Sequence, residues 1–193
     1  MNDNIWSWDA TKIGEKIGTR KISVREAVES NLKRLKDVNP NINAVVDILD
    51  EDALCTADKL DNSVLESQDV GPLHGVPITI KINIDYAGRP TTNGVVAFKD
   101  MIAPEDSITV ESFRKAGAVI IGRTNVPAFS TRFFTDNALH GQTLNPWDPK
   151  KTPGGSSGGA AAAVASGIGA LAHGNDRAGS VRYPAFACGV YGF

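Results

Sequence analysis

The chain has 193 residues, of which 41% are hydrophobic and 22% charged, and its formal net charge is −2. This composition is typical of a globular protein, and the length suits one domain with at most a small appendage. A near-neutral charge without a basic cluster argues against a nucleic-acid-binding protein. The amino terminus lacks the basic start and apolar core of a secretion signal, and the small-apolar stretch 160–172 is too short and too interrupted to span a bilayer.

Cysteine usage gives a further bound on the class of protein. Cys55 and Cys188 lie in different contexts and do not form a metal-ligand spacing. We therefore expect a reduced, cytoplasmic protein without a metal site.

In the amino-terminal part of the chain, apolar residues recur twice at helical spacing. Ser23 and Glu26 form a capping-box pattern, and the helix that they start should end near Asn39 and Pro40. The expected elements, in chain order, are a helix over 24–37, a strand over 44–48, a helix capped by Asp50, a polar loop over 63–72 and a strand over 76–84.

The carboxy-terminal part continues the alternation of helices and strands. Ser107 should cap a helix that ends near Gly117. Further expected elements are a buried strand over 118–121, a loop over 135–157, a tightly packed helix over 158–167 and a further strand that starts within 189–193. This order predicts an α/β fold around a mostly parallel or mixed sheet.

Two serines lie in separate loops of small residues. Ser156 is in the run Gly-Gly-Ser-Ser-Gly-Gly at 154–159, and Ser180 follows a glycine in the segment 176–182. A serine hydroxyl is a weak nucleophile at neutral pH and needs a base. Lys81 is the best candidate, because the end of an apolar strand-like run leaves little water around it and so favours the neutral amine.

This constellation resembles the amidase signature family, the serine hydrolases that use a Ser–Ser–Lys triad. The matching blocks occur in the family's order, from about residue 71 to the last residue. They are 71–77 with Lys81, 122–125, 145–147, 153–159, 179–182, 184–185 and 188–190. A glycine–serine loop alone would be weak evidence, whereas the whole set of blocks is specific.

The resemblance implies a mechanism in which Ser180 attacks an amide carbonyl, Ser156 relays the proton and neutral Lys81 is the final base. It also implies a cis peptide bond before Ser156. Ser157 is expected to support the loop and the substrate by hydrogen bonds. The implied reaction is hydrolysis of a carboxylic amide to a carboxylate and ammonia or an amine, through an acyl-enzyme and without a cofactor.

The resemblance further implies an oxyanion hole made of backbone N–H groups from one tight loop, which would stabilise the charge of the tetrahedral intermediate. Its members are Arg177, Ala178, Gly179 and Ser180. Asp176 and Arg182 flank the nucleophile and are expected to be structural partners beside the substrate site.

Three positions depart from the family's pattern. Ala178 stands where glycine is usual, which is tolerable if its φ is negative. Arg177 stands where a smaller or uncharged residue is usual, and a guanidinium aimed at the pocket would help to keep Lys81 neutral but would obstruct an apolar acyl group. Ile82 stands where Asp is common, which puts the hydrogen bonds that orient Lys81 in question.

Members of this family are much longer than this chain, so the resemblance implies the amino-terminal part of a single domain. We expect a helical region over 1–60 and the catalytic signature core over 71–193, in an α/β fold whose mixed, mostly parallel sheet is flanked by helices and whose carboxy-terminal part is missing. The expected partner is a small-molecule amide. Neither nucleic acid nor a membrane is expected, and a homodimer is left open.

Other functions stay open at this point. A subunit that releases ammonia from glutamine for a tRNA-dependent partner is a close variant, although segment 133–137 does not resemble that subgroup. Residues 167–172 fit the pattern G-x-G-x-x-A of a nucleotide-binding module, but an alanine-rich helix precedes them instead of a strand. A catalytically incomplete fragment is a third alternative, because of the three departures and the missing sequence.

Several single residues have ordinary structural interpretations. His173 lies near Ser180 and Asp176 in the sequence, but a Ser-His-Asp triad is recognised by geometry, and we expect a loop histidine with satisfied hydrogen bonds. Cys188 is predicted to be a small buried hydrophobe, and Trp147 a packing anchor in its turn.

Overall fold

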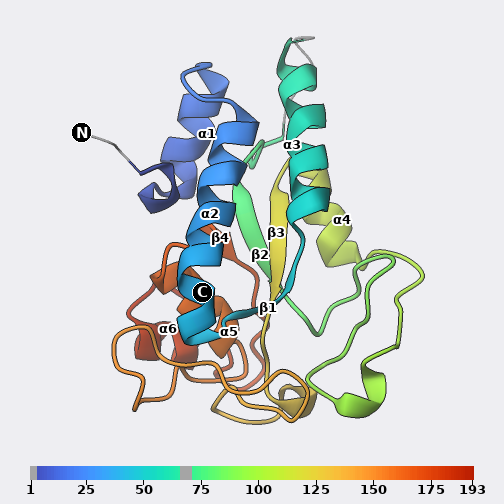
Figure 1. The fold of residues 1–193 in the computed structure, drawn as a ribbon, viewed down its shortest axis with the longest axis vertical. Coiled ribbons are helices and arrows are strands. Elements are labelled where there is room, and N and C mark those ends of the chain that lie inside the picture. Colours follow the sequence, from blue (N-terminus) through green and yellow to red (C-terminus); the bar gives the residue numbers. More distant parts are fainter. Residues whose placement is uncertain (1–3, 66–70) are drawn as a thin grey trace.

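The strands form one sheet in the computed structural model, which describes residues 4–65 and 71–193 (Figure 1). In chain order they are β1 Val45–Ile48, β2 Pro77–Lys81, β3 Val119–Thr124 and β4 Leu171–Ala172. Their order in the sheet is β1-β3-β2-β4. β2 pairs in parallel with both β3 and β4, whereas β1 pairs antiparallel with β3. The predicted α/β fold with a mixed, mostly parallel sheet is therefore confirmed.

Helices surround this sheet. They are α1 Ala10–Gly18, α2 Val24–Ile42, α3 Asp50–Leu65, α4 Ile108–Lys115, α5 Gly158–Ala165 and α6 Arg182–Cys188, with short 3-10 turns η1 Ile5–Ser7, η2 Val96–Phe98 and η3 Ala128–Ser130. α2 and α3 lie side by side and pack on β3, while α5 packs on β2 and β4 and contacts α6 (Figure 1). Within the described residues, no helix combines the length and the apolar character needed to cross a membrane.

The central strands β2 and β3 are buried along their whole length. Ile78, Ile80 and Ile121 are at most 1% exposed, and full burial of such a side chain stabilises the fold by about 1.5–3 kcal/mol. The continuous apolar run at 118–121 predicted a strand that is covered on both faces, and the burial of β3 confirms this.

α2 starts as predicted and ends later than predicted. Ser23 accepts a hydrogen bond from the backbone of Glu26, whose side chain accepts one from the backbone of Ser23, so the capping box is present. The helix continues past Pro40 to Ile42, because the proline lies in the last turn. Asn43 then ends it in the left-handed conformation, and the Asn39 side chain holds the backbone of the exiting chain at Ala44 and Val45.

Other boundaries also differ from expectation. α3 extends through residues 63–65 of the expected polar loop, and residues 66–70 of that loop lie outside the described part. β2 ends at Lys81 instead of residue 84, and residues 189–193 form no strand. The sequence reasoning did not predict α1, β4 or α6.

The turn after β2 is held by Arg123, whose side chain is fully buried. Its guanidinium donates to the carbonyl oxygens of Ile82 at 3.3 Å and Ile84 at 3.1 Å, and it forms an ion pair with Asp47 at 3.2 Å. Because these bonds bend the chain directly after the strand, they fix the position of Lys81 at the end of β2.

Candidate active site

Lys81 is fully buried at the end of β2. Its Nζ lies 2.7 Å from Oγ of Ser156 and 2.6 Å from Oδ1 of Asn175. Burial lowers the pKa of Lys81 from 10.5 to about 7, against the opposing effect of the negative charge on Asp176. At pH 7 about half of such amines are neutral, compared with roughly one in three thousand for an ordinary lysine. The side chain can therefore accept a proton near neutral pH.

The loop that carries Ser156 is packed into the structure. The peptide bond between Gly155 and Ser156 is cis, as the resemblance implies. A Cβ on Gly155 would lie 2.5 Å from the carbonyl oxygen of Arg132, and one on Gly159 would lie 2.6 Å from the backbone of Asn125. Real Cβ atoms do not come so close, so glycine lets this loop and the start of α5 reach their neighbours.

Asp176 organises the loop that carries Ser180. Its carboxylate accepts hydrogen bonds from the backbone N–H groups of Gly179 at 2.7 Å, Val181 at 3.0 Å and Arg182 at 3.2 Å. It also forms an ion pair with the Arg182 guanidinium at 3.0 Å. The Arg182 hydrogen bond, followed by those backbone groups, holds the pKa of Asp176 well below its usual value. Asp176 and Arg182 thus form an ion pair within this loop, and their place beside the substrate stays a prediction.

The two serine loops are joined through the backbone. The N–H of Ser157 donates to the carbonyl oxygen of Ser180 at 3.1 Å. Ser180 is half-buried, and within the described residues no hydrogen bond joins its hydroxyl to that of Ser156. The structure thus brings Lys81 and Ser156 into direct contact and places Ser180 on the adjoining loop.

The backbone N–H groups of the expected oxyanion hole are not all available. The N–H of Gly179 is donated to Asp176. Across the part of the chain that the structure describes, the N–H groups of Arg177, Ala178 and Ser180 have no protein acceptor. Gly179 has a φ of +101°, which favours glycine, whereas Ala178 is not among the residues of positive φ. Alanine is therefore compatible with the backbone at 178.

The structure bears on the departures at Arg177 and Ile82. Arg177 is exposed, and the lowered pKa of Lys81 comes from burial instead of from this guanidinium. Ile82 is 1% exposed and contributes its carbonyl oxygen to Arg123. Lys81 contacts Ser156 and Asn175, and neither contact involves the residue at position 82.

Asn175 is a site residue that the sequence reasoning missed. Its Nδ2 donates to Oδ1 of Asn83 at 3.4 Å, and Asn83 in turn donates to Oγ of Ser130 at 3.3 Å. An asparagine in a glycine-rich loop usually signals a turn. Its place directly before Asp176 was the one signal that linked it to the site.

The hydroxyl of Ser157 is buried, and in the described structure it has no hydrogen-bond partner. Its backbone N–H donates to the carbonyl oxygen of Ser180, and a role of Ser157 in holding the substrate stays a prediction.

His173 does not form a triad with Ser180 and Asp176. The hydrogen-bond donors of Asp176 are the groups described above, none of which belongs to His173. The ring packs edge-on against Phe113, and Nδ1 is buried without a partner in the described residues, so the expectation of a satisfied histidine was wrong. Burial, with a smaller effect from the charge on Lys81, lowers its pKa to about 4, which leaves the ring neutral at pH 7.

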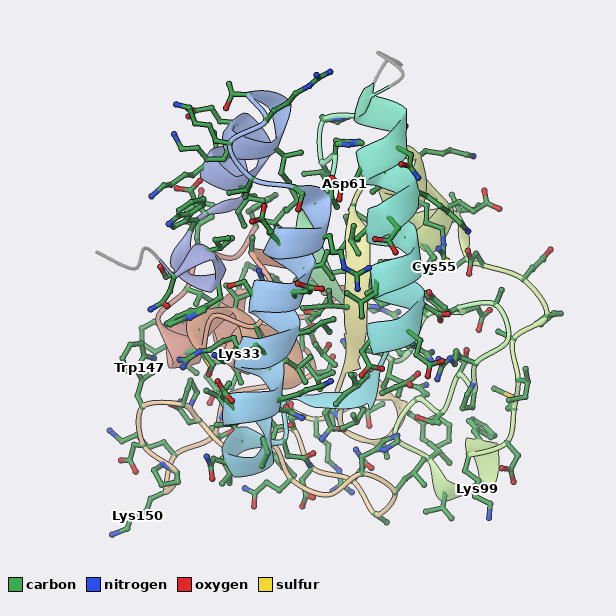
Figure 2. The ribbon with its side chains drawn as sticks, turned by 45° about the horizontal axis from the view of Figure 1, so that its top comes forward. Lys33, Cys55, Asp61, Lys99, Trp147 and Lys150 are labelled. Carbon is green, nitrogen blue, oxygen red and sulfur yellow. The ribbon has the colours of Figure 1, made fainter. Side chains whose placement is uncertain are left out.

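Two further residues have structural roles. Cys188 is fully buried, and burial raises its pKa to about 12, so the prediction of a buried hydrophobe is confirmed. Trp147 is 70% exposed at the edge of the molecule (Figure 2), and its Nε1 donates to the carbonyl oxygen of Cys188 at 2.7 Å. It ties its turn to the end of α6 by this bond instead of by burial.

The nucleotide-binding pattern lacks its required context. Residues 167–172 follow α5 and lead into β4, whereas a dinucleotide fingerprint follows a strand and opens a helix. Gly167 and Gly169 adopt positive φ, and a Cβ on Gly167 would meet the Trp6 ring at 2.5 Å. These glycines serve chain reversal and close packing.

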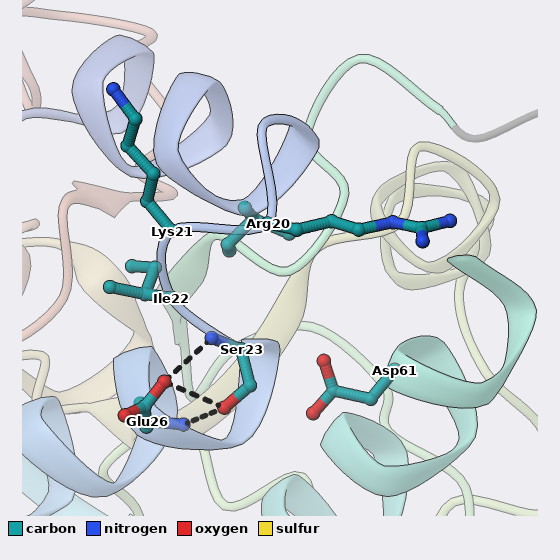
Figure 3. A pocket seen from close by; sticks show the side chains of 7 residues that line it. Arg20, Lys21, Ile22, Ser23, Glu26 and Asp61 are labelled. Carbon is teal, nitrogen blue, oxygen red and sulfur yellow. Dashed lines mark hydrogen bonds between the residues drawn. The ribbon is translucent and has the colours of Figure 1, made fainter. Parts of the chain in front are cut away.

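A cavity of about 370 Å³ lies far from Lys81, between the start of α2 and α3 (Figure 3). Its acidic residues are engaged: Glu26 closes the capping box, and Asp61 accepts the N–H groups of Val24 and Arg25. Lys81 lies near the other end of α2, because its partner Thr124 pairs with Val45 just after that helix. A 19-residue helix separates the two ends by about 28 Å.

Comparison with known proteins places the chain in a family. Residues 26–193 match the family model described as Amidase. An indoleacetamide hydrolase from Bradyrhizobium diazoefficiens is 55% identical over 96% of this chain and 36% of its own length. One subunit of the glutamyl-tRNA(Gln) amidotransferase from Carboxydothermus hydrogenoformans is 41% identical over 95% of this chain and 38% of its own length. The structure of a fatty acid amide hydrolase matches with a TM-score of 0.91 and 30% identity, over 96% of this chain and 33% of that one.

The chain therefore belongs to the amidase signature family, as its motifs suggested. It spans 36% and 38% of the length of these two curated relatives.

Proposed function

We propose that this chain is the amino-terminal, catalytic part of an amidase that hydrolyses a carboxylic amide through an acyl-enzyme at Ser180. The observation that carries the proposal is the 2.7 Å contact between Lys81 Nζ and Ser156 Oγ in a buried site. A base there must be neutral near pH 7, and burial supplies that condition. The short span of the chain relative to its relatives supports the assignment to one part of a longer domain.

The proposed reaction begins when Ser180 Oγ attacks the amide carbonyl carbon. The Ser180 proton passes to Ser156 Oγ while the Ser156 proton passes to Lys81, which becomes an ammonium group. The carbonyl oxygen becomes negatively charged and accepts hydrogen bonds from the backbone N–H groups of Arg177, Ala178 and Ser180, which have no other protein acceptor among the described residues.

The tetrahedral intermediate then loses its amine. The C–N bond breaks as the leaving nitrogen takes a proton from Ser156, which regains one from Lys81. A water molecule attacks the acyl ester by the same proton route, and the C–O bond to Ser180 breaks to release the carboxylic acid, which ionises to the carboxylate. Lys81 ends neutral, so the cycle is balanced.

The relatives suggest a first substrate to test. A relative that is 55% identical is named an indoleacetamide hydrolase, so we propose indoleacetamide as the first amide to assay. The amidotransferase relative is less similar, at 41%. Ammonia release from glutamine that requires a partner protein would favour that second function.

The test uses the full-length protein that carries this chain. A fluorophosphonate should add one adduct by intact mass, and Ser180→Ala should abolish the adduct and lower amide turnover by about 10⁴-fold or more. Ser112→Ala, an exposed serine on α4, serves as the matched control. Labelling that survives Ser180→Ala would exclude Ser180 as nucleophile, and unchanged turnover in Lys81→Ala at neutral pH would exclude Lys81 as base.

A further inference from the structure

Asn175 provides the second contact of the Lys81 amine. Its Oδ1 lies 2.6 Å from Nζ, a distance as short as that from Nζ to Ser156 Oγ, 2.7 Å. An amide oxygen can only accept hydrogen bonds, so this contact takes one N–H of the amine in either protonation state. A neutral amine has two N–H groups and one lone pair, and fixing one N–H restricts where the lone pair points.

The orientation of the Asn175 amide is set by a second asparagine. Nδ2 of Asn175 donates to Oδ1 of Asn83 at 3.4 Å. Asn83 is linked onward through its own Nδ2 to Oγ of Ser130 at 3.3 Å, and Ser130 donates to Oδ1 of Asn93 at 3.3 Å. These bonds are long, but together they turn the oxygen of Asn175, and not its NH₂ group, toward Lys81.

The groups around Lys81 differ in charge. Asp176 is the acidic neighbour, and its carboxylate is engaged by Arg182. His173 is neutral at pH 7, and Arg177 is exposed on the same loop. Both direct partners, Ser156 and Asn175, are uncharged. A carboxylate at position 175 would keep the same acceptor geometry and place a full negative charge against the ammonium form.

We propose that Asn175 is a positioning residue for Lys81: its side-chain oxygen accepts one N–H and so directs the nitrogen lone pair toward Ser156, without a charge that would keep the amine protonated. This inference rests on the proposed role of Lys81 as the base. Asn175, which does not belong to the proposed triad, would thus keep the base both oriented and neutral.

The first experiment measures the ionisation of Lys81 directly, without turnover. The protein is labelled with ¹³C at lysine Cε, the Lys81 signal is assigned by its loss in Lys81→Met, and its pKa is read by NMR titration. Asn175→Asp should raise that pKa by about 1–3 units, because an adjacent opposite charge favours the charged form. Asn62→Asp makes the same change at an exposed position on α3 and should leave it unchanged. A shift in Asn175→Asp no larger than that in Asn62→Asp would overturn the inference.

The second experiment uses amide turnover by the full-length protein. Asn175→Ala should lower kcat about 10-fold or more with little change in KM, since orientation of the base affects proton transfer in the transition state. Asn175→Asp should move the acid limb of the pH–rate profile upward by the same amount as the NMR pKa and recover activity at alkaline pH, which a merely structural defect would not do. Wild-type kcat in Asn175→Ala at every pH would overturn the inference. An NMR shift without movement of the acid limb would instead contradict the proposed role of Lys81.

Discussion

Lys81 is a buried amine whose direct partners carry no charge. Buried lysines are usually paired with a carboxylate, since an unpaired charge in a low-dielectric interior is costly. Here the partners are a hydroxyl and an amide oxygen, and Asp176 acts on the amine without a direct hydrogen bond. The amine therefore avoids the cost of burying a charge by losing its proton. The neutral amine that results is the form that a base requires.

The first prediction concerns the pH dependence of turnover. With a Lys81 pKa of about 7, the active neutral form is lost as pH falls through that value. The rate constant kcat/KM for amide hydrolysis should fall about 10-fold for each pH unit below it. A pH–rate profile between pH 5 and 9, with buffers of constant ionic strength, checks this. A flat profile across pH 6–8 would contradict a neutral Lys81 as the base.

The second prediction concerns stability. The Lys81 pKa is lower in the folded state, so the unfolded chain binds more protons between about pH 7 and 10.5, and stability due to this group rises with pH in that window. Burial of the amine therefore costs free energy at pH 7, and Lys81→Met removes this cost. The cost is about 4 kcal/mol at pH 7, so after about 1 kcal/mol is lost for each of two hydrogen bonds the variant should be more stable by about 2 kcal/mol at that pH.

Urea denaturation of Lys81→Met and of the wild type at pH 7, 8.5 and 10 measures the difference. The advantage of the methionine variant should shrink as pH rises, because deprotonation of the wild-type lysine then costs less. A relative stability that does not fall with pH would contradict the lowered pKa.

At this scale the sequence predicted part of the site. The resemblance pointed to Lys81 and Ser156, whose atoms meet across 75 residues of sequence. It could not point to Asn175, because the partner of a buried amine depends on where three loops meet. For the same reason the sequence did not show that the N–H of Gly179 is taken by Asp176.

At the scale of elements, the glycine–serine loop and the start of α5 depend on close backbone approach. A Cβ on Gly159 would lie 2.6 Å from backbone atoms of Asn125 and 2.7 Å from the carbonyl oxygen of Ala44. Asn125 follows β3 and Ala44 precedes β1. Gly159 therefore lets α5 pack against two connections of the sheet and holds Ser156 beside Lys81.

The third prediction follows from this contact. Gly159→Ala should destabilise the protein by about 1–3 kcal/mol, because backbone atoms cannot move aside as a flexible side chain can. Gly14→Ala is the matched control: Gly14 lies inside α1 with nothing within 4 Å of its Cβ position, so alanine should stabilise that helix by about 0.5–1 kcal/mol. Thermal and urea unfolding of both variants tests the contrast, and equal stability of the two would refute the packing argument.

The sequence predicted the elements whose signals are local. The capping box of α2, the Ser107 cap of α4 and the buried run of β3 are all present. β4 has two residues, and α6 begins within the loop of Ser180, so neither offers a periodic pattern of sufficient length. The predicted end of α2 near Pro40 was too early, because a proline in the final turn disturbs few helical hydrogen bonds.

At the scale of the whole molecule, aromatic side chains on and after α6 are exposed. Phe186 on α6 is 84% exposed, and the following Tyr191 and Phe193 are 89% and 97% exposed. The curated relatives compared above are longer than this chain, which spans 36% and 38% of their lengths. Exposed apolar surface of this kind is usually covered by further protein. This agrees with the proposal that the chain is one part of a longer domain.

The last prediction compares residues 1–193 alone with the full-length protein. The isolated chain should bind a hydrophobic dye strongly and self-associate in sedimentation experiments, because its aromatic surface has no cover. Its Ser180 should react with a fluorophosphonate at least about 10-fold more slowly, because a loop without its supporting walls holds the nucleophile and the oxyanion donors less well. Ser180→Ala, made in residues 1–193 and in the full-length protein, gives the rate of labelling at other residues. Equal labelling rates would show that residues 1–193 suffice to build the reactive site, and the expected support from the rest of the domain would then be wrong.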